Sequence, residues 1–112
     1  MMFGLNDAVY ADIAAVFARY PAIQQVLIFG SRAKGTAKPG SDIDLAVVAP
    51  AMDAATFTQL WNELDALPLI FKLDVLHLDT LMQPGLKTRI ENEGRCFYTP
   101  GVALQHLLNP QI

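Results

Sequence analysis

Apolar positions recur along the chain at two different spacings, which divide it into predicted helices and strands. From Leu5 to Tyr20 they return every three or four residues, as on the buried face of an amphipathic helix. Asn6 or Asp7 can cap the start of this helix with its side chain, and Pro21 cannot continue it. We therefore expect the chain to open with one amphipathic helix.

Two later stretches show the same helical spacing. One begins after Asp53, a capping residue, and ends at Pro68. The other runs from about Leu81 to Glu93, and it is followed by Gly94, a residue type that commonly stands just beyond the last turn of a helix. The helix after Asp53 is predicted to bury its apolar side chains, which are Phe57, Leu60, Trp61, Leu64 and Leu67.

Four shorter apolar runs are predicted strands, over residues 25–29, 42–49, 69–78 and 95–98. The link between the first two is about a dozen residues long, which is marginal for the helical crossover that joins parallel strands. We therefore expect a mixed sheet rather than a doubly wound parallel one. The predicted fold class is α/β (α+β), with a mixed sheet of about four strands and helices on one face.

Length and hydropathy indicate one small domain with apolar surface to spare. The chain has 112 residues, which fits a single domain over 1–112, although the apolar but weakly patterned tail at 100–112 leaves its structure open. Hydrophobic residues make up 53% of the sequence, and the mean hydropathy is +0.30. Because so small a domain has much surface to cover, we expect an apolar patch that docks a partner.

Charge and cysteine content exclude several classes of protein. The net charge is −3 and the isoelectric point about 5.1, so the basic surface typical of proteins that bind nucleic acid directly is not expected. A single cysteine, Cys96, allows neither an intrachain disulfide nor a cysteine-rich zinc cluster. Residues 1–10 lack the features of a signal peptide, and no apolar run approaches the ~20 residues of a membrane span. We expect a cytoplasmic protein with no membrane contact.

Two aspartates, Asp42 and Asp44, stand at the start of the second predicted strand. Successive side chains of a strand point to opposite faces, so both carboxylates lie on one face, ~6–7 Å apart along the strand. The two charges repel each other, and Mg²⁺, which prefers oxygen ligands, removes the repulsion by binding both. The alternative is that both aspartates lie on an ordinary solvated strand face.

A third aspartate, Asp74, lies in the apolar run of the third predicted strand. A buried carboxylate without a partner is costly, and a place beside the second strand would let Asp74 complete a cluster of three carboxylates. The alternative is an ion pair with Lys72, two residues away on the same face. His77, flanked by Leu76 and Leu78, is expected to be structural rather than a ligand.

A Gly-Ser turn, Gly30–Ser31, directly follows the first predicted strand. Glycine lets a phosphate approach the backbone closely, and a short helix beginning at Ser31 would point free N–H groups at that phosphate. Arg32 and Lys34 add positive charge to the same stretch. The stretch lacks the GxxxxGK[ST] pattern of a P-loop, and such turns are common at strand ends.

The combination of these features is distinctive: Gly30–Ser31, ten residues, Asp42 to Asp44, and Asp74 on a later strand. It resembles the signature of the DNA polymerase β nucleotidyltransferase superfamily. The segment GSRAKGTAKPGSDIDLAV is similar to the version found in the minimal nucleotidyltransferase (MNT) family, and IENEGRCFY resembles that family's last helix and strand. The resemblance implies a polymerase β-like nucleotidyltransferase fold.

The resemblance also implies roles for individual residues, as in an enzyme that uses Mg²⁺ and ATP. Gly30 and Ser31 would hold the β- and γ-phosphates of ATP, and Arg32 or Lys34 would neutralise the leaving pyrophosphate unless they are simply solvated. The carboxylates would ligate two Mg²⁺ ions, and the third of them would also help to activate the acceptor hydroxyl. In this assignment Asp42, Asp44 and Asp74 are the catalytic and metal-binding residues, while Ser41 shapes the loop.

The acceptor is expected to be a protein, because a domain of this size has no room for a second lobe that would hold another substrate. MNT proteins are the antitoxin half of HEPN–MNT toxin–antitoxin pairs, so the resemblance implies transfer of AMP to a tyrosine of a HEPN ribonuclease toxin within a hetero-oligomer. Three alternatives stay open. The chain could mask its toxin without catalysis, modify a small molecule of the antibiotic type, or be an unrelated domain with a chance motif.

Overall fold

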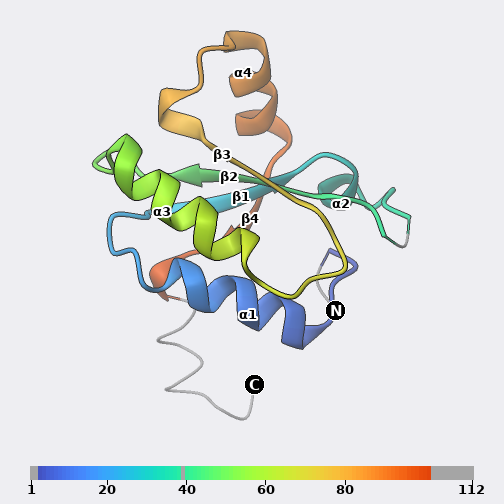
Figure 1. Cartoon of the computed structure of the whole chain (residues 1–112). Helices are drawn as coiled ribbons and strands as arrows, with labels where there is room; N and C mark the ends of the chain where they lie inside the picture. The colour runs from blue at the N-terminus through green and yellow to red at the C-terminus, as the bar shows by residue number, and fades with distance from the viewer. Residues whose placement is uncertain (1–2, 39, 102–112) are drawn as a thin grey trace.

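A computed structural model describes residues 3–38 and 40–101 of the chain, as helices packed around one sheet (Figure 1). The expectations for the tail beyond Gly101 lie outside the described residues. The helices are α1 (Asp7–Phe17), α2 (Ser31–Lys34), α3 (Ala54–Asp65), the 3-10 turn η1 (Leu78–Thr80) and α4 (Pro84–Glu93). The strands are β1 (Gln25–Phe29), β2 (Ile43–Val48), β3 (Leu73–His77) and β4 (Arg95–Tyr98).

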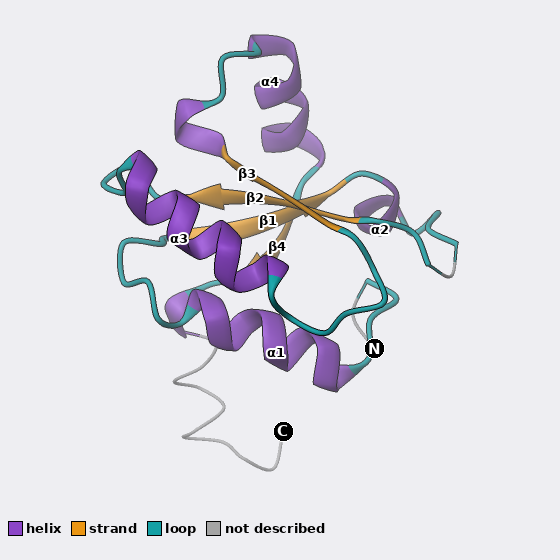
Figure 2. Cartoon of the chain, in the orientation of Figure 1, coloured by secondary structure: helices purple, strands orange, loops and turns teal. Residues whose placement is uncertain are grey.

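The four strands form a mixed sheet in the order β3-β2-β1-β4, as Figure 2 shows. β1 pairs antiparallel with β2 and with β4, while β2 and β3 are parallel. The parallel pair is joined by the crossover helix α3, as parallel neighbours require. The shorter link between β1 and β2 joins antiparallel strands instead. The predicted fold class and mixed sheet are confirmed.

Side chains predicted to cap the helices do so. The Asn6 side chain accepts a hydrogen bond from the Val9 N–H at 2.8 Å at the start of α1, and Asp53 accepts one from the Thr56 N–H at 2.7 Å at the start of α3. Gly94 follows α4 as predicted but does not adopt the left-handed conformation, since its φ is −67°. A Cβ there would lie 2.5 Å from the Ile90 carbonyl oxygen, so close packing is what requires glycine.

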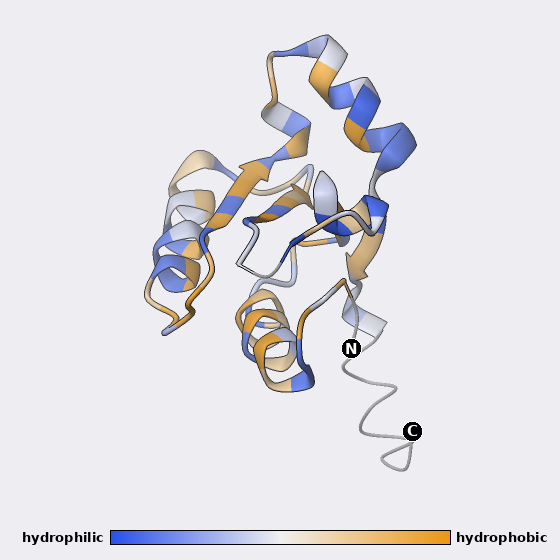
Figure 3. Cartoon of the chain, turned by 90° about the vertical axis from the view of Figure 1, so that its right-hand side faces the viewer, coloured by the Kyte–Doolittle hydropathy of each residue, from blue (hydrophilic) through white to orange (hydrophobic). Residues whose placement is uncertain are grey.

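Hydrophobic side chains cover both faces of the sheet, which corrects the expectation of helices on one face. α1 and α3 pack on the face that carries Ile28, Leu45 and Val47, whereas α4 and η1 cover the face that carries Ala46. The reason is that the strands are apolar on both faces and need cover on each. In Figure 3 the strands are predominantly hydrophobic and α4 is predominantly hydrophilic. No helix in the described ranges is long and apolar enough to cross a membrane.

The third strand is shorter than predicted, and this changes the surroundings of α3. β3 begins at Leu73, so residues 69–72 belong to the connection from α3 rather than to the sheet. Trp61 was expected in the core, but 42% of it is exposed. Its indole faces the β3 side of the sheet, and among the described residues no strand lies beyond β3 to cover it. The core face of α3 is carried by Leu60 and Leu64.

Candidate active site

The Gly30 turn ends β1 and begins α2, so the predicted short helix after this glycine is present. Gly30 has a φ of +75°, a conformation that side chains other than glycine rarely adopt. A Cβ at this position would lie 2.6 Å from the Oδ2 atom of Asp44. Backbone conformation and close approach thus both require glycine here.

The strand register brings the three predicted aspartates to one place. Asp44 of β2 is the direct neighbour of Asp74 on the parallel strand β3 and of Phe29 on the antiparallel strand β1. Neighbouring strands lie ~4.8 Å apart, so the two carboxylates project side by side from the same face. Asp42 immediately precedes β2 and acts electrostatically on Asp44. The parallel pairing of β2 and β3 therefore brings together aspartates that are 30 residues apart in the sequence, Asp44 and Asp74.

Burial and like charges raise the pKa of Asp44 above its ordinary value. Desolvation is the largest cause, followed by the carboxylates of Asp74 and Asp42, whereas the Arg32 guanidinium lowers the pKa. Such mutual repulsion is what the sequence pattern predicted for this strand face. The cluster carries excess negative charge that a bound cation would neutralise.

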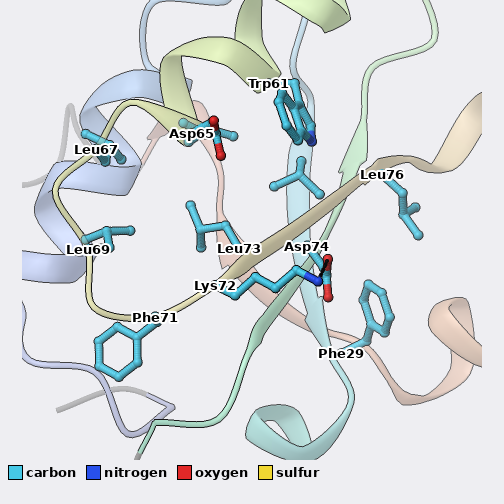
Figure 4. A pocket seen from close by; sticks show the side chains of 12 residues that line it. Phe29, Trp61, Asp65, Leu67, Leu69, Phe71, Lys72, Leu73, Asp74 and Leu76 are labelled. Carbon is cyan, nitrogen blue, oxygen red and sulfur yellow. Dashed lines mark ion pairs between the residues drawn. The ribbon is translucent and has the colours of Figure 1, made fainter.

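Asp74 is exposed, so the expectation that it is buried is wrong. It lies on an edge strand, and its side chain is 49% exposed. Its Oδ1 atom lies 3.7 Å from the Lys72 Nζ atom, and Figure 4 shows this pair beside Phe29. Both interpretations of Asp74 therefore describe real neighbours: it belongs to the carboxylate cluster and it also pairs with Lys72. An exposed pair of this kind is weak and easily exchanged.

The three carboxylates suit a divalent cation by their chemistry. Aspartate oxygens are the ligands that Mg²⁺ prefers, and burial together with the neighbouring carboxylates raises the pKa of Asp44. Among the described residues, however, no three acidic, histidine or cysteine groups already converge on one point as a metal site would require. The donors fit the ion by their chemistry.

Arg32 faces the protein interior. Only 4% of the residue is exposed, and its guanidinium lies 4.9 Å from the centre of the Phe71 ring. It donates hydrogen bonds to the carbonyl oxygens of Ser41 (2.7 Å), Asp42 (3.2 Å) and Phe3 (3.0 Å). These bonds use the Nε–H and one N–H group each of Nη1 and Nη2. Arg32 thereby fixes the segment that carries Asp42.

Lys34 and the two serines complete the loop between β1 and β2. The Lys34 Nζ atom lies 3.3 Å from the Glu93 Oε1 atom of α4, and the lysine side chain is 56% exposed. Ser31 is the first residue of α2, and its carbonyl oxygen accepts a hydrogen bond from the Thr36 N–H at 3.0 Å. The Ser41 hydroxyl accepts one from the Lys38 N–H at 2.9 Å, in line with its expected role in shaping the loop.

His77 lies on the face opposite the carboxylates, where it serves the packing of the sheet. Its Nε2 atom is 2.9 Å from the Ala49 carbonyl oxygen and 3.4 Å from Asp79, and its ring stacks on Phe57 with centroids 5.3 Å apart. The residue is buried. Its contacts agree with the structural role expected from the sequence.

An open groove of about 620 Å³ follows β3 along the edge of the sheet. The strand divides its lining into two sides, as Figure 4 shows. On the α3 side lie apolar side chains that include Trp61, Leu73 and Val75. On the other side lie Asp74, Phe29 and Leu76. Sequence reasoning missed this groove because it placed Trp61 in the core.

Comparisons with known proteins were made by family and by fold. A family model described as "Polymerase beta, Nucleotidyltransferase" matches residues 11–100. No curated protein matches the chain. The match spans all three aspartates and the Gly30 turn, and it includes every strand of the sheet.

Solved structures share the fold at low sequence identity. A chain from the crystal structure of a toxin–antitoxin with AMP-PNP is 21% identical, with a TM-score of 0.65 over 91% of this chain and 90% of that one. A chain from the MntA–HepT toxin–antitoxin is 18% identical, with a TM-score of 0.59 over 95% and 92%. A chain from the tri-AMPylated Shewanella oneidensis HEPN toxin in complex with MNT antitoxin is 18% identical, with a TM-score of 0.60 over 96% and 92%.

Proposed function

The chain belongs to the polymerase beta nucleotidyltransferase family, and from that premise we propose that it transfers AMP from ATP to a tyrosine of a HEPN toxin protein. The observation that carries the proposal is the arrangement at one end of β2. There the Gly30 backbone lies against Asp44, and Asp74 is the next residue across the sheet. A phosphate-binding turn and a carboxylate cluster thus meet at one point, as phosphoryl-group chemistry requires.

The nucleotide is held by the turn and the loop that follows it. Gly30 lets the β- and γ-phosphates approach the backbone, and Ser31 adds a hydroxyl donor. Lys34 is exposed and reaches the phosphates by exchanging its contact with Glu93. Arg32 acts indirectly by holding the Asp42 segment through carbonyl oxygens. The donor substrate therefore lies on the α2 side of the carboxylates.

Asp42, Asp44 and Asp74 would hold Mg²⁺, which when bound supplies positive charge to the phosphates and to the reacting oxygens. In the transfer step the acceptor oxygen forms a bond to the α-phosphorus, and the bond from that phosphorus to the pyrophosphate oxygen breaks. The acceptor proton passes to the carboxylate of Asp74, which is exposed and faces the solvent side of the cluster. The products are an AMP-modified acceptor and pyrophosphate.

A protein acceptor is supported by the comparisons and by the surface of the chain. Two of the similar chains come from complexes that contain a HEPN or HepT toxin, one of which is AMP-modified. The match covers about nine-tenths of the length of those chains. Exposed apolar side chains, such as Trp61, Ile70 and Met82, offer surface for a protein partner.

Rescue of growth together with AMP labelling tests the proposal. The chain is produced with a candidate HEPN toxin, the product of the adjacent gene, either as wild type or with Asp42→Asn and Asp44→Asn, and label from α-labelled ATP on the partner is measured. Asp12→Asn, an exposed aspartate of α1, is the matched control. We expect wild type and the control to label and silence the partner and the double variant to do neither. A double variant that silences the partner without label would establish masking in place of catalysis.

A further inference from the structure

β3 is an edge strand whose outer backbone groups are available for pairing. In the described part of the chain, β3 pairs with β2 and with no other strand. The Ile43 N–H donates to the Lys72 carbonyl oxygen at 2.9 Å, so residues 72, 74 and 76 turn their backbone groups toward β2. Since residues alternate along a parallel strand, Leu73 and Val75 turn theirs outward. An outward row of this kind is a template for one more strand.

The groove beside this edge has the shape and lining that an added strand needs. Its volume is about 620 Å³, and it follows β3 on both faces of the sheet. One face offers the apolar side chains of Trp61, Leu73 and Val75. The opposite face offers Asp74, flanked by Phe29 and Leu76 (Figure 4). Side chains of an added strand would alternate between these two environments.

We propose that an extended segment of the acceptor protein pairs with β3 as a fifth strand and so delivers its hydroxyl group to Asp74. This inference rests on the function proposed above, because it takes Asp74 as part of the site. Directly opposite residues of paired strands have Cβ atoms about 4.5–5.5 Å apart. A tyrosine, serine or threonine opposite Asp74 therefore projects from the same face, toward the carboxylates and the nucleotide.

The pairing imposes a sequence pattern on the acceptor segment. The residues immediately before and after the modified one project from the other face, where Trp61, Leu73 and Val75 lie. Apolar residues at these two positions cover the exposed indole. Charged residues there would be buried against apolar side chains without a partner. The acceptor is thus recognised by its hydroxyl residue and by apolar neighbours on both sides.

Substitution of the strand edge tests the pairing without touching the aspartates. Val75→Pro removes the outward N–H and leaves the bonds between β2 and β3, because proline is tolerated on the free side of an edge strand. We expect transfer of AMP to the partner protein to fall by about tenfold or more, a change that corresponds to about 1.4 kcal/mol. Binding of Mg²⁺–ATP stays as in wild type. Val75→Thr, which keeps the N–H, is the control.

A side-chain variant keeps the test decisive if Val75→Pro fails to fold. Trp61→Ala removes the largest side chain of the groove, and the control Met82→Ala removes a more exposed apolar side chain outside it, 90% exposed against 42% for Trp61. We expect Trp61→Ala to raise the KM for the partner protein by about tenfold with little change in kcat. Met82→Ala leaves both unchanged. Equal effects of the two variants would overturn the proposal.

Peptide binding tests the alternation directly. Trp61 is the only tryptophan, so its fluorescence reports events in the groove. Tryptophan-free nine-residue peptides carry a central tyrosine with valine on both sides, or with glutamate on both sides. We expect the valine peptide to shift the fluorescence at a concentration at least about fivefold lower than the glutamate peptide. Identical titration curves would contradict the pairing.

Failure of this inference can be told apart from failure of the proposed function. If the wild-type chain transfers no AMP to its partner, the proposed function fails. If wild type transfers AMP and the Val75→Pro and Trp61→Ala variants transfer it equally well, the function stands and the strand pairing is wrong. A second copy of this chain on the β3 edge would double the mass of the free protein in light scattering, and that result would also overturn the proposal.

Discussion

Gly30 and Asp44 pack against each other so closely that a single methyl group on the glycine would lie 2.6 Å from the Asp44 Oδ2 atom. The contact joins the end of β1 to the start of β2, which is where those two antiparallel strands place Phe29 opposite Asp44. The Gly30 turn and the carboxylate cluster are thereby fixed relative to each other. A change on either side is expected to disturb both.

Gly30→Ala is expected to slow transfer of AMP strongly, and Gly35→Ala provides a control at a second glycine of positive φ. Both glycines have nearly the same positive φ, +75° and +76°, but a Cβ at Gly35 meets no atom within 4 Å. Gly35 is left-handed, with a ψ of 14°, so its alanine variant loses ~1 kcal/mol of stability through backbone strain, measured by urea unfolding. Gly30 has a ψ of −152°, a conformation that essentially only glycine adopts, so its alanine variant loses more. Gly30→Ala additionally displaces Asp44, so its kcat/KM falls by ~100-fold while that of Gly35→Ala changes little. Comparable losses in both variants would show that strain alone matters.

Asp44→Asn is expected to stabilise the metal-free protein while it removes activity. The folded-state pKa of Asp44 is raised above its unfolded value, so its ionised form destabilises the fold, and this penalty disappears as the pH falls through the raised pKa. The variant should therefore melt roughly 1–3 °C higher than wild type at pH 7. The difference shrinks on acidification. A lower melting temperature for the variant at neutral pH would contradict the assigned repulsion.

Lys72→Met separates the two interpretations of Asp74. The pair is exposed, so its loss changes the free energy of unfolding by no more than ~0.5 kcal/mol. Release of the carboxylate leaves transfer of AMP within about fivefold of wild type, whereas Asp74→Asn lowers it by ~100-fold or more. The measurement is the rate of AMP transfer from labelled ATP by each variant. If Lys72→Met is as inactive as Asp74→Asn, the ion pair itself is what the site requires.

Arg32→Lys tests whether Arg32 positions the Asp42 segment. Lysine keeps the charge but cannot serve the carbonyl oxygens of Ser41, Asp42 and Phe3 together. We expect the variant to bind Mg²⁺ ~10-fold more weakly than wild type in the presence of ATP, because it loses hydrogen bonds that hold the segment of the proposed metal ligand Asp42. Arg89→Lys, a surface residue paired with Glu93, leaves the Mg²⁺ titration unchanged. An unaltered titration for Arg32→Lys in a folded protein would refute the positioning role.

Local sequence signals were sufficient for most of the secondary structure. Asn6 and Asp53 mark helix starts because their side chains bond backbone N–H groups within the same turn. β1 and β4 were predicted with their observed bounds, since each is a short apolar run set off by turn residues. The start of β3 was not predictable in this way. Leu69 and Phe71 are as apolar as strand residues, but they pack against the core beside α3, and hydrogen bonding to β2 begins only at the Lys72 carbonyl oxygen.

Some features of the candidate site were likewise predictable from local sequence, and others depend on contacts between distant residues. The spacing of Asp42 and Asp44 predicts a carboxylate pair, and the chemistry of Gly30 follows from its place after a strand. That Asp74 is the neighbour of Asp44 depends on the parallel pairing of β2 and β3, which no local signal fixes. The inward direction of Arg32 depends on contacts with residues far along the chain.

Intact-mass spectrometry of the partner protein tests the central claim most directly. The purified chain is incubated with ATP, Mg²⁺ and the product of the adjacent gene as the candidate HEPN partner, whose mass is then measured. The account predicts a mass increase of one or more AMP units that requires both Asp42 and Asp44 and maps to a hydroxyl side chain. A partner that is bound and silenced at its unmodified mass would contradict the account.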